Sequence, residues 1–174
     1  VVAMVFLPEL RVGGMQIFRS EGFDTFGKIL PRATEISSRI SVIYLTLTLV
    51  CDFAYLSSGM NAFDATVHAM TTVATGGFGT HDGSFEAFPA ASEYVAIVFM
   101  LLAALPFVRF VQLSAGSAKP LMQDTQIHAF FGTAIVIAGL IAVWNLTQGG
   151  EIVGEVTVRK ALFNSVSLLT GTGY

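Results

Sequence analysis

Residues 62–79 read AFDATVHAMTTVATGGFG, a short apolar segment followed by a Gly-rich run. Its first part, 63–74, has helical character but only about 12 residues, whereas crossing a bilayer takes about 20 mostly apolar residues. The Gly-rich run TGGFG at 75–79 ends it sharply, and Asn61 with Asp64 resembles a capping arrangement at its start. We therefore expect a re-entrant helix. Non-helical backbone at membrane depth is tolerated only if it is buried in protein or lines a water-filled cavity.

Three longer apolar stretches surround this segment, at about 36–56, 93–115 and 127–147. Each is long enough to cross a bilayer. Hydrophobic residues make up 53% of the 174 positions and charged residues 12%, against about 25% charged in a typical soluble domain. The composition therefore predicts an all-α membrane protein. A net charge of -3 without a basic stripe argues against binding of nucleic acid.

The basic residues predict the orientation in the membrane, because cytoplasmic segments are enriched in Lys and Arg. Residues 57–92 carry neither and are expected outside, where Arg159 and Lys160 are the two remaining candidates. The seven residues expected inside are Arg11, Arg19, Lys28, Arg32, Arg39, Arg109 and Lys119.

The re-entrant pattern returns as VRKALFNSVSLLTGTGY at 158–174, which indicates an internal repeat. An offset of 96 residues aligns its two parts. The aligned pairs are Ala65 with Ala161, His68 with Asn164, Thr71 with Ser167, Gly77 with Gly173, and Phe78 with Tyr174. The predicted unit is a helix, a pore loop and a second helix.

The repeat divides the chain into three parts. We expect 1–28 to close a first unit and form a cytoplasmic linker, 29–116 to be a complete second unit, and 117–174 to begin a third. The third would stop inside its Gly-rich loop, 171–174. Because the chain also opens on Val1 within an apolar run, we expect an internal fragment of a larger protein.

The two Gly-rich loops are candidates for binding K⁺. A dehydrated K⁺ needs oxygens in place of its water shell, and successive backbone carbonyls can supply them. The C-terminal end of each preceding short helix carries partial negative charge, which favours a cation. A single Gly-rich turn is a weak signal, but two in register on the Lys/Arg-poor side favour a cation pathway. The candidate residues are Thr75, Gly76, Gly77, Phe78, Gly171, Thr172, Gly173 and Tyr174.

Five runs carry a more specific resemblance. They are LRVGGMQIFRSEG, LPRATEISSRI, FDATVHAMTTVATGGFGTHDGS, LPFVRFVQL and FNSVSLLTGTGY. All look like segments of TrkH-type proteins in the TrkH/KtrB superfamily of K⁺ uptake proteins, and the resemblance covers essentially the whole chain. It implies four helix–pore loop–helix repeats around one pore, of which this chain holds about one and a half.

The resemblance also implies surroundings and residue roles. Such proteins form multi-pass homodimers in the bacterial plasma (inner) membrane, in contact with lipid, and bind a cytosolic TrkA-like ring of nucleotide-binding regulatory subunits. Their filter glycines match Gly77 and Gly173, with carbonyls of the preceding residues coordinating K⁺. Phe78 and Tyr174 would brace the filter strands from behind. K⁺ would be the transported ion, with no covalently bound cofactor.

Other functions fit less well. A cation-coupled secondary transporter of another class also uses broken helices, but inverted repeats are common there, and the repeats here run in one direction. No segment combines a nucleophile, a base and an orienting group, so an enzyme is not expected. A phosphate-binding loop fails because 75–82 lacks the required lysine.

The polar residues near the first loop permit two further interpretations. His68, His81 and Asp82 could bind a transition metal, but we favour a hydrogen bond from His68 to the filter loop and no such metal site. Asp82, Glu86 and Glu93 could make the outer mouth acidic and raise the local cation concentration. Thr71 and Thr72 are expected to bond back to helix carbonyls.

Overall fold

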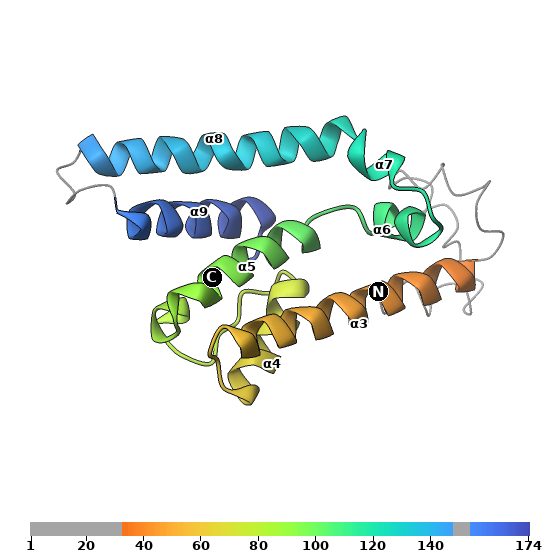
Figure 1. Cartoon of the computed structure of the whole chain (residues 1–174), viewed down its shortest axis with the longest axis horizontal. Helices are drawn as coiled ribbons and strands as arrows, with labels where there is room; N and C mark the ends of the chain where they lie inside the picture. The colour runs from red at the N-terminus through yellow and green to blue at the C-terminus, as the bar shows by residue number, and fades with distance from the viewer. Residues whose placement is uncertain (1–32, 148–153) are drawn as a thin grey trace, which may run out of the picture.

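A computed structural model describes the backbone of residues 33–147 and 154–174 and the side chains of 37–144 and 154–174. The predicted first part, 1–28, lies outside the described residues, as do four of the seven basic residues expected inside. All described regular elements are helices, in agreement with the predicted class (Figure 1). They are α3 (Ala33–Ser57), α4 (Ala62–Val73), η2 (Ser84–Ala87), α5 (Ala90–Ala103), α6 (Phe107–Ser114), α7 (Lys119–Met122), α8 (Thr125–Thr147) and α9 (Glu155–Thr170).

Two of these helices are long and apolar enough to cross a membrane. Ser37–Ser57 in α3 spans 21 residues with mean hydropathy 1.7, and Thr125–Trp144 in α8 spans 20 residues with mean hydropathy 2.1. They correspond to the first and third predicted spans.

The second predicted span, 93–115, is not one straight helix. α5 and α6 together are apolar enough to cross, but they are bent by 85° at the break between them. Pro106 begins α6 there with φ -58° and ψ 118°. Proline lacks the N–H that would continue the helix and disfavours helical geometry at Leu105 before it. The second predicted span therefore consists of two helices joined at a bend, and the prediction of one continuous span was wrong.

The short helix α4 begins as its sequence indicated. The side-chain oxygen of Asn61 accepts a hydrogen bond from the backbone N–H of Asp64 at 2.9 Å, and its amide nitrogen donates to Asp64 Oδ2 at 2.6 Å. The backbone of Asn61 is extended, as an N-cap requires. The predicted capping arrangement is confirmed.

Removing this cap gives a first test of the fold. We expect Asn61→Ala to lower the free energy of unfolding of the full-length protein by about 1 kcal/mol, because an N–H at the helix start loses its acceptor. Thermal unfolding in detergent would measure the change. Thr133→Ala, which removes an exposed hydroxyl bonded to Ala129 O within α8, is the control and should change stability much less.

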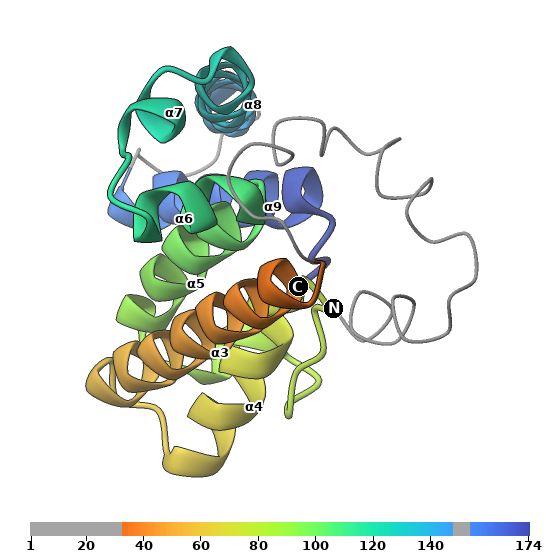
Figure 2. The same cartoon turned by 90° about the vertical axis from the view of Figure 1, so that its right-hand side faces the viewer.

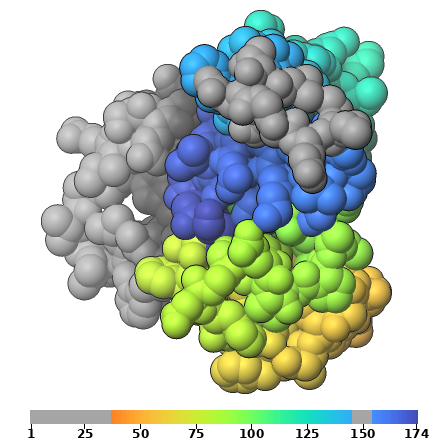
Figure 3. Space-filling view, turned by 90° about the vertical axis from the view of Figure 1, so that its left-hand side faces the viewer, coloured from red at the N-terminus to blue at the C-terminus, as the bar shows by residue number. Residues whose placement is uncertain are grey.

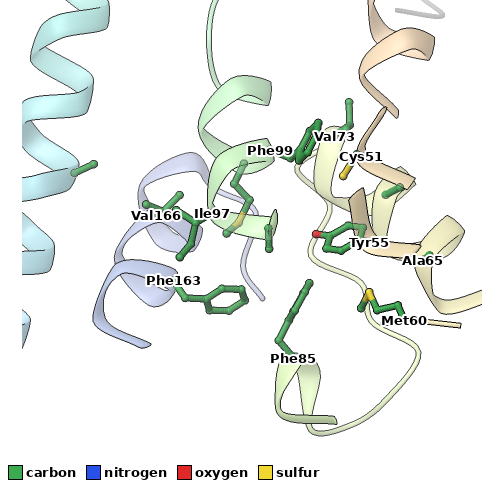
Figure 4. Packing of buried hydrophobic residues seen from close by; sticks show 14 residues of the cluster. Cys51, Tyr55, Met60, Ala65, Val73, Phe85, Ile97, Phe99, Phe163 and Val166 are labelled. Carbon is green, nitrogen blue, oxygen red and sulfur yellow. The ribbon is translucent and has the colours of Figure 1, made fainter. Parts of the chain in front are cut away.

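The helices form three layers in Figures 1 and 2. α3 and α4 lie on one side, α5 and α9 in the middle, and α8 on the other side. α5 contacts both short helices, α4 and α9. Phe85 from η2 lies between Tyr55 and Phe163 in the core, with ring centroids 6.0 and 5.0 Å away (Figure 4). The aromatic core therefore joins the two predicted repeats.

The basic residues in the described part of the chain lie at the two ends of the molecule. Arg39, Arg109 and Lys119 belong to the end where α3 and α8 begin, whereas Arg159 and Lys160 lie at the end where α3 and α8 finish (Figure 1). Following the predicted orientation, we call these the inner end and the outer end. The start of α9 is thus at the outer end.

Candidate functional site

The two Gly-rich loops meet in the structure although 96 residues separate them in the sequence. We call residues 75–79 the first Gly loop and residues 171–174 the second Gly loop. A Cβ atom built at Gly77 would overlap the carbonyl oxygen of Thr172 and lie 2.9 Å from its carbonyl carbon. The two backbones therefore approach so closely that only glycine fits at 77.

The first Gly loop is held by its amide groups. The N–H of Gly76 donates to Thr71 O at 2.7 Å, and the N–H of Thr75 donates to Thr72 O at 3.1 Å, so both bonds run back to the end of α4. Thr75 and Gly77 have positive φ angles of 51° and 65°. Such angles cost little for glycine but strain threonine.

The second Gly loop is held to α9 in the same way, by backbone N–H groups that donate hydrogen bonds to the end of the helix. The N–H of Gly173 donates to Ser167 O at 3.3 Å, and the N–H of Tyr174 donates to Ser167 Oγ at 2.8 Å. Gly171 ends α9 in the left-handed conformation, and Gly173 also has a positive φ of 82°. The repeated residues of the sequence thus adopt related but not identical backbones.

The backbone carbonyl groups of the two loops differ from the N–H groups in their hydrogen bonding. Within the described part of the chain, no donor bonds the carbonyl oxygens of these six residues: Thr75, Gly76, Gly77, Gly171, Thr172 and Gly173. A buried carbonyl oxygen is nearly always paired in a folded protein, and of these six residues Thr172 is buried while the other five are partly or fully exposed. The two loops therefore gather spare acceptors in one place, at the C-terminal ends of two helices.

Tyr174 lies behind the first Gly loop and bonds to α4. Its hydroxyl is 2.6 Å from Thr71 Oγ1 and 2.7 Å from Thr72 Oγ1, and it donates to His68 O at 3.2 Å. Thr72 also bonds the hydroxyl of Tyr55 on α3 at 2.8 Å. The Tyr174 hydroxyl therefore links the second Gly loop to α4, in a chain of hydroxyl groups that also includes Tyr55 of α3.

Phe78 does not brace the strand. Its side chain is 74% exposed among the described residues, and its ring lies over Gly76. Tyr174 occupies the space next to α4, where its hydroxyl satisfies both threonines and a phenylalanine could not. The carbonyl oxygen of Phe78 accepts a bond from Thr71 Oγ1 at 2.9 Å, so one of its lone pairs is already used.

Two expectations for α4 side chains were wrong. His68 is fully buried, but its Nδ1 bonds Asp64 O within the helix and its Nε2 has no hydrogen-bond partner among the described residues. Rings surround it, with Phe88 and Phe85 at 4.9 and 5.2 Å, so it packs instead of bonding the loop. Thr72 bonds tyrosines rather than a helix carbonyl. Phe85 and Phe88 therefore decide the environment of His68, whereas Tyr55 and Tyr174 decide that of Thr72.

The outer end contains fewer free acidic groups than expected. Glu93 pairs with Arg159 at 2.6 Å, and Glu86 pairs with Lys160 at 2.9 Å, which lowers the pKa of Glu86. Of the three acids proposed for an acidic mouth, Asp82 and Glu86 are exposed and Glu93 is buried. No group of three or more His, Cys, Asp or Glu side chains arranged for a metal ion occurs within 37–144 and 154–174.

At the inner end, a further ion pair joins α6 to Asp124, the residue just before α8. Arg109 Nη2 lies 2.7 Å from Asp124 Oδ2, and Arg109 Nη1 donates to Gln112 Oε1 at 3.0 Å. A hydrogen bond from the backbone N–H of Gln126, together with Arg109, lowers the pKa of Asp124. The bent helix is thus tied to the next predicted repeat.

Sequence reasoning missed the residues that support the loops. Tyr55 and Ser167 carried no functional assignment, yet they bond Thr72 and Tyr174. The alignment of Thr71 with Ser167 was the available signal, because both place a hydroxyl in the last turns of a short helix. Tyr55 gave none, since its partner lies 17 residues away on another helix.

Comparison with known proteins agrees with the resemblance. The chain is 36% identical over its whole length to the Trk system potassium uptake protein TrkI of Halomonas elongata, covering 35% of that protein. It is 34% identical to the Trk system potassium uptake protein TrkH of Escherichia coli strain K12, of which it covers 37%. The chain thus spans little more than a third of these relatives.

A solved structure supports the fold. The crystal structure of the potassium transporter TrkH from Vibrio parahaemolyticus superimposes with a TM-score of 0.73 at 31% identity, over 82% of this chain and 31% of that one. The TrkH family, described as cation transport proteins, matches residues 1–174. Such a family consists of transporters, in agreement with the prediction that the chain is not an enzyme. Matched over its full length, the chain belongs to the TrkH family of cation transport proteins.

Proposed function

We propose that this chain supplies two of four loops of a K⁺ pathway and that its function is K⁺ uptake. The observation that supports the proposal is the meeting of the two Gly loops at Gly77 and Thr172, each just after a helix end, with six carbonyl oxygens that accept no hydrogen bond from the described residues. Carbonyl oxygens replace the water shell of K⁺. The potassium uptake function named for the relatives agrees with this chemistry.

The proposed coordinating groups are the carbonyls of Thr75, Gly76, Gly77, Gly171, Thr172 and Gly173. Phe78 would contribute only through its second lone pair, because Thr71 already bonds its carbonyl. Tyr174 acts through its hydroxyl on α4 as a brace. Two loops provide half of a ring, so the remaining ligands come from two further repeats of the full-length protein.

The larger assembly is part of the proposal. Residues 29–116 form the second helix–pore loop–helix unit, 117–174 begin the third, and 1–28 close the first. The full-length protein is a multi-pass homodimer of the bacterial inner membrane, and a TrkA-like cytosolic ring regulates it. Its inner surface would include the end that carries Arg39, Arg109 and Lys119.

Growth at low K⁺ tests the proposal. The full-length protein is expressed in a bacterium that lacks its own K⁺ uptake systems, and growth is scored at submillimolar K⁺. We expect rescue, with uptake of K⁺ into cells measured in parallel. Confirmed membrane expression without rescue or K⁺ uptake would contradict the proposal and favour a transporter for another cation, which uptake assays with other ions would identify.

A further inference from the structure

Arg159 and Lys160 are the two basic residues that do not follow the predicted inside bias, and the structure gives them partners. Arg159 Nη1 lies 2.6 Å from Glu93 Oε1 on α5, and Arg159 Nε lies 2.8 Å from Glu155 Oε1 on α9 itself. Only 8% of the Arg159 side chain and 7% of the Glu93 side chain are exposed. This is a buried ion pair between two predicted repeats.

The geometry of the pair leaves little freedom. The guanidinium group presents two of its nitrogens to two carboxylates, a directional arrangement that lysine cannot reproduce. Glu155 also accepts a hydrogen bond from the hydroxyl of Tyr94 on α5 at 2.6 Å. The first turns of α9 are therefore joined to α5 at two successive residues, Glu93 and Tyr94. Figure 3 shows α9 lying against α5 on this side of the molecule.

Burial makes each member of the pair depend on the other. Removing one partner of a buried pair leaves an uncompensated charge, which is strongly unfavourable. Glu93 Oε2 has no hydrogen-bond partner in the described structure, so Arg159 provides the stabilising contact that this carboxylate has. The exposed pair between Lys160 and Glu86 lacks this dependence because water can solvate both groups.

Arg159, one member of the pair, lies on the helix that leads into the second Gly loop. α9 continues from Arg159 to Thr170 without interruption, and the loop follows directly. A helix rises about 1.5 Å per residue, so the pair lies about 18 Å from Gly171 along the axis. A shift or tilt of α9 at its outer end therefore moves the carbonyls of the loop against Gly77, where no space is left.

We propose that Arg159 and Glu93 are positioning residues that set the height and tilt of α9, and so align the second Gly loop with the first. The proposal rests on the proposed K⁺ pathway. Tyr174 holds the loop end of α9 to α4, and the Arg159–Glu93 pair holds the outer end to α5. Both contacts bind the third repeat to the second.

Ion selectivity of the purified full-length protein in liposomes tests this role. Initial rates of K⁺ and Na⁺ uptake are compared for wild type and Arg159→Lys, which keeps the charge but can engage only one carboxylate well. We expect the K⁺ to Na⁺ ratio to fall about tenfold, since directly coupled residues interact strongly enough for such a change. Lys160→Gln, on the same helix turn, is the matched control and should change the ratio less than about twofold.

A mutant cycle separates pairing from independent effects. Arg159→Gln and Glu93→Gln should each lower the ratio, and the double variant should come closer to wild type than the product of the single effects. A wild-type ratio in Arg159→Lys, even with reduced protein in the membrane, would overturn the inference. Absence of K⁺ uptake by the wild type would instead contradict the proposed function.

Discussion

Gly77→Ser in the full-length protein is expected to relax the discrimination of K⁺ over Na⁺ by about tenfold or more. The serine Cβ would overlap the Thr172 carbonyl oxygen, so the two Gly loops must separate. The φ of 65° at this position adds a strain of about 1–2 kcal/mol for a residue with a Cβ. Because a change of about 1.4 kcal/mol is tenfold in an equilibrium constant, modest displacement of the carbonyls is sufficient.

Substitutions at two other glycines separate the effect of the added side chain from the effect of backbone strain on ion selectivity. Gly83→Ser places the same side chain in open space at a φ of -79°, and it should leave the ion preference unchanged. Gly116→Asn, at the end of α6, keeps a positive φ of 87° with nothing within 4 Å, and asparagine tolerates this region, so its effect should be small. Uptake of K⁺ and Na⁺ into liposomes measures all three. An unchanged preference in Gly77→Ser would count against the assigned loop.

The second large effect is expected for Tyr174→Phe. The change removes one hydroxyl that contacts Thr71 and Thr72, and it leaves these groups in a partly buried site without that partner. Such a loss costs about 1–3 kcal/mol. We expect the free energy of unfolding to fall by this amount and the K⁺ to Na⁺ ratio to fall with it, because the second Gly loop loses its contact with α4.

Thermal unfolding and ion uptake of the same protein samples would measure both results. Tyr44→Phe is the matched control, since it removes the hydroxyl of a tyrosine on α3 whose ring lies beside Phe107 of α6, with ring centroids 6.4 Å apart. Adding Thr72→Val to Tyr174→Phe should cost less than the two changes made separately, because they share one bond. A stable, fully selective Tyr174→Phe protein would show that the brace is dispensable.

Much of this fold could be predicted from local patterns. The run at 62–79 is too short and too apolar for any element other than a short helix leading into a Gly-rich loop, and the Asn61 cap marks its start. Hydrophobic length predicted α3 and α8. These features depend on neighbours in the sequence, so no knowledge of the tertiary arrangement was needed.

The sequence contains the cause of the break in the second span, at residues 105 and 106. Leu105 and Pro106 carry the reason for the bend, since proline removes a helix hydrogen bond and restricts the residue before it. The size of the bend, 85°, depends on more than proline. The ion pair of Arg109 with Asp124 fixes where α6 lies, and that partner is 15 residues away.

Local sequence patterns predict the long helices, the two Gly loops and the resemblance to the TrkH family. The contact of the loops at Gly77 and Thr172, the hydrogen bonds of Tyr174 to α4, and the pairing of Glu93 with Arg159 depend on the tertiary arrangement. Periodicity and composition report which face or span a residue belongs to. They do not report partners that depend on how α5 packs against both α4 and α9.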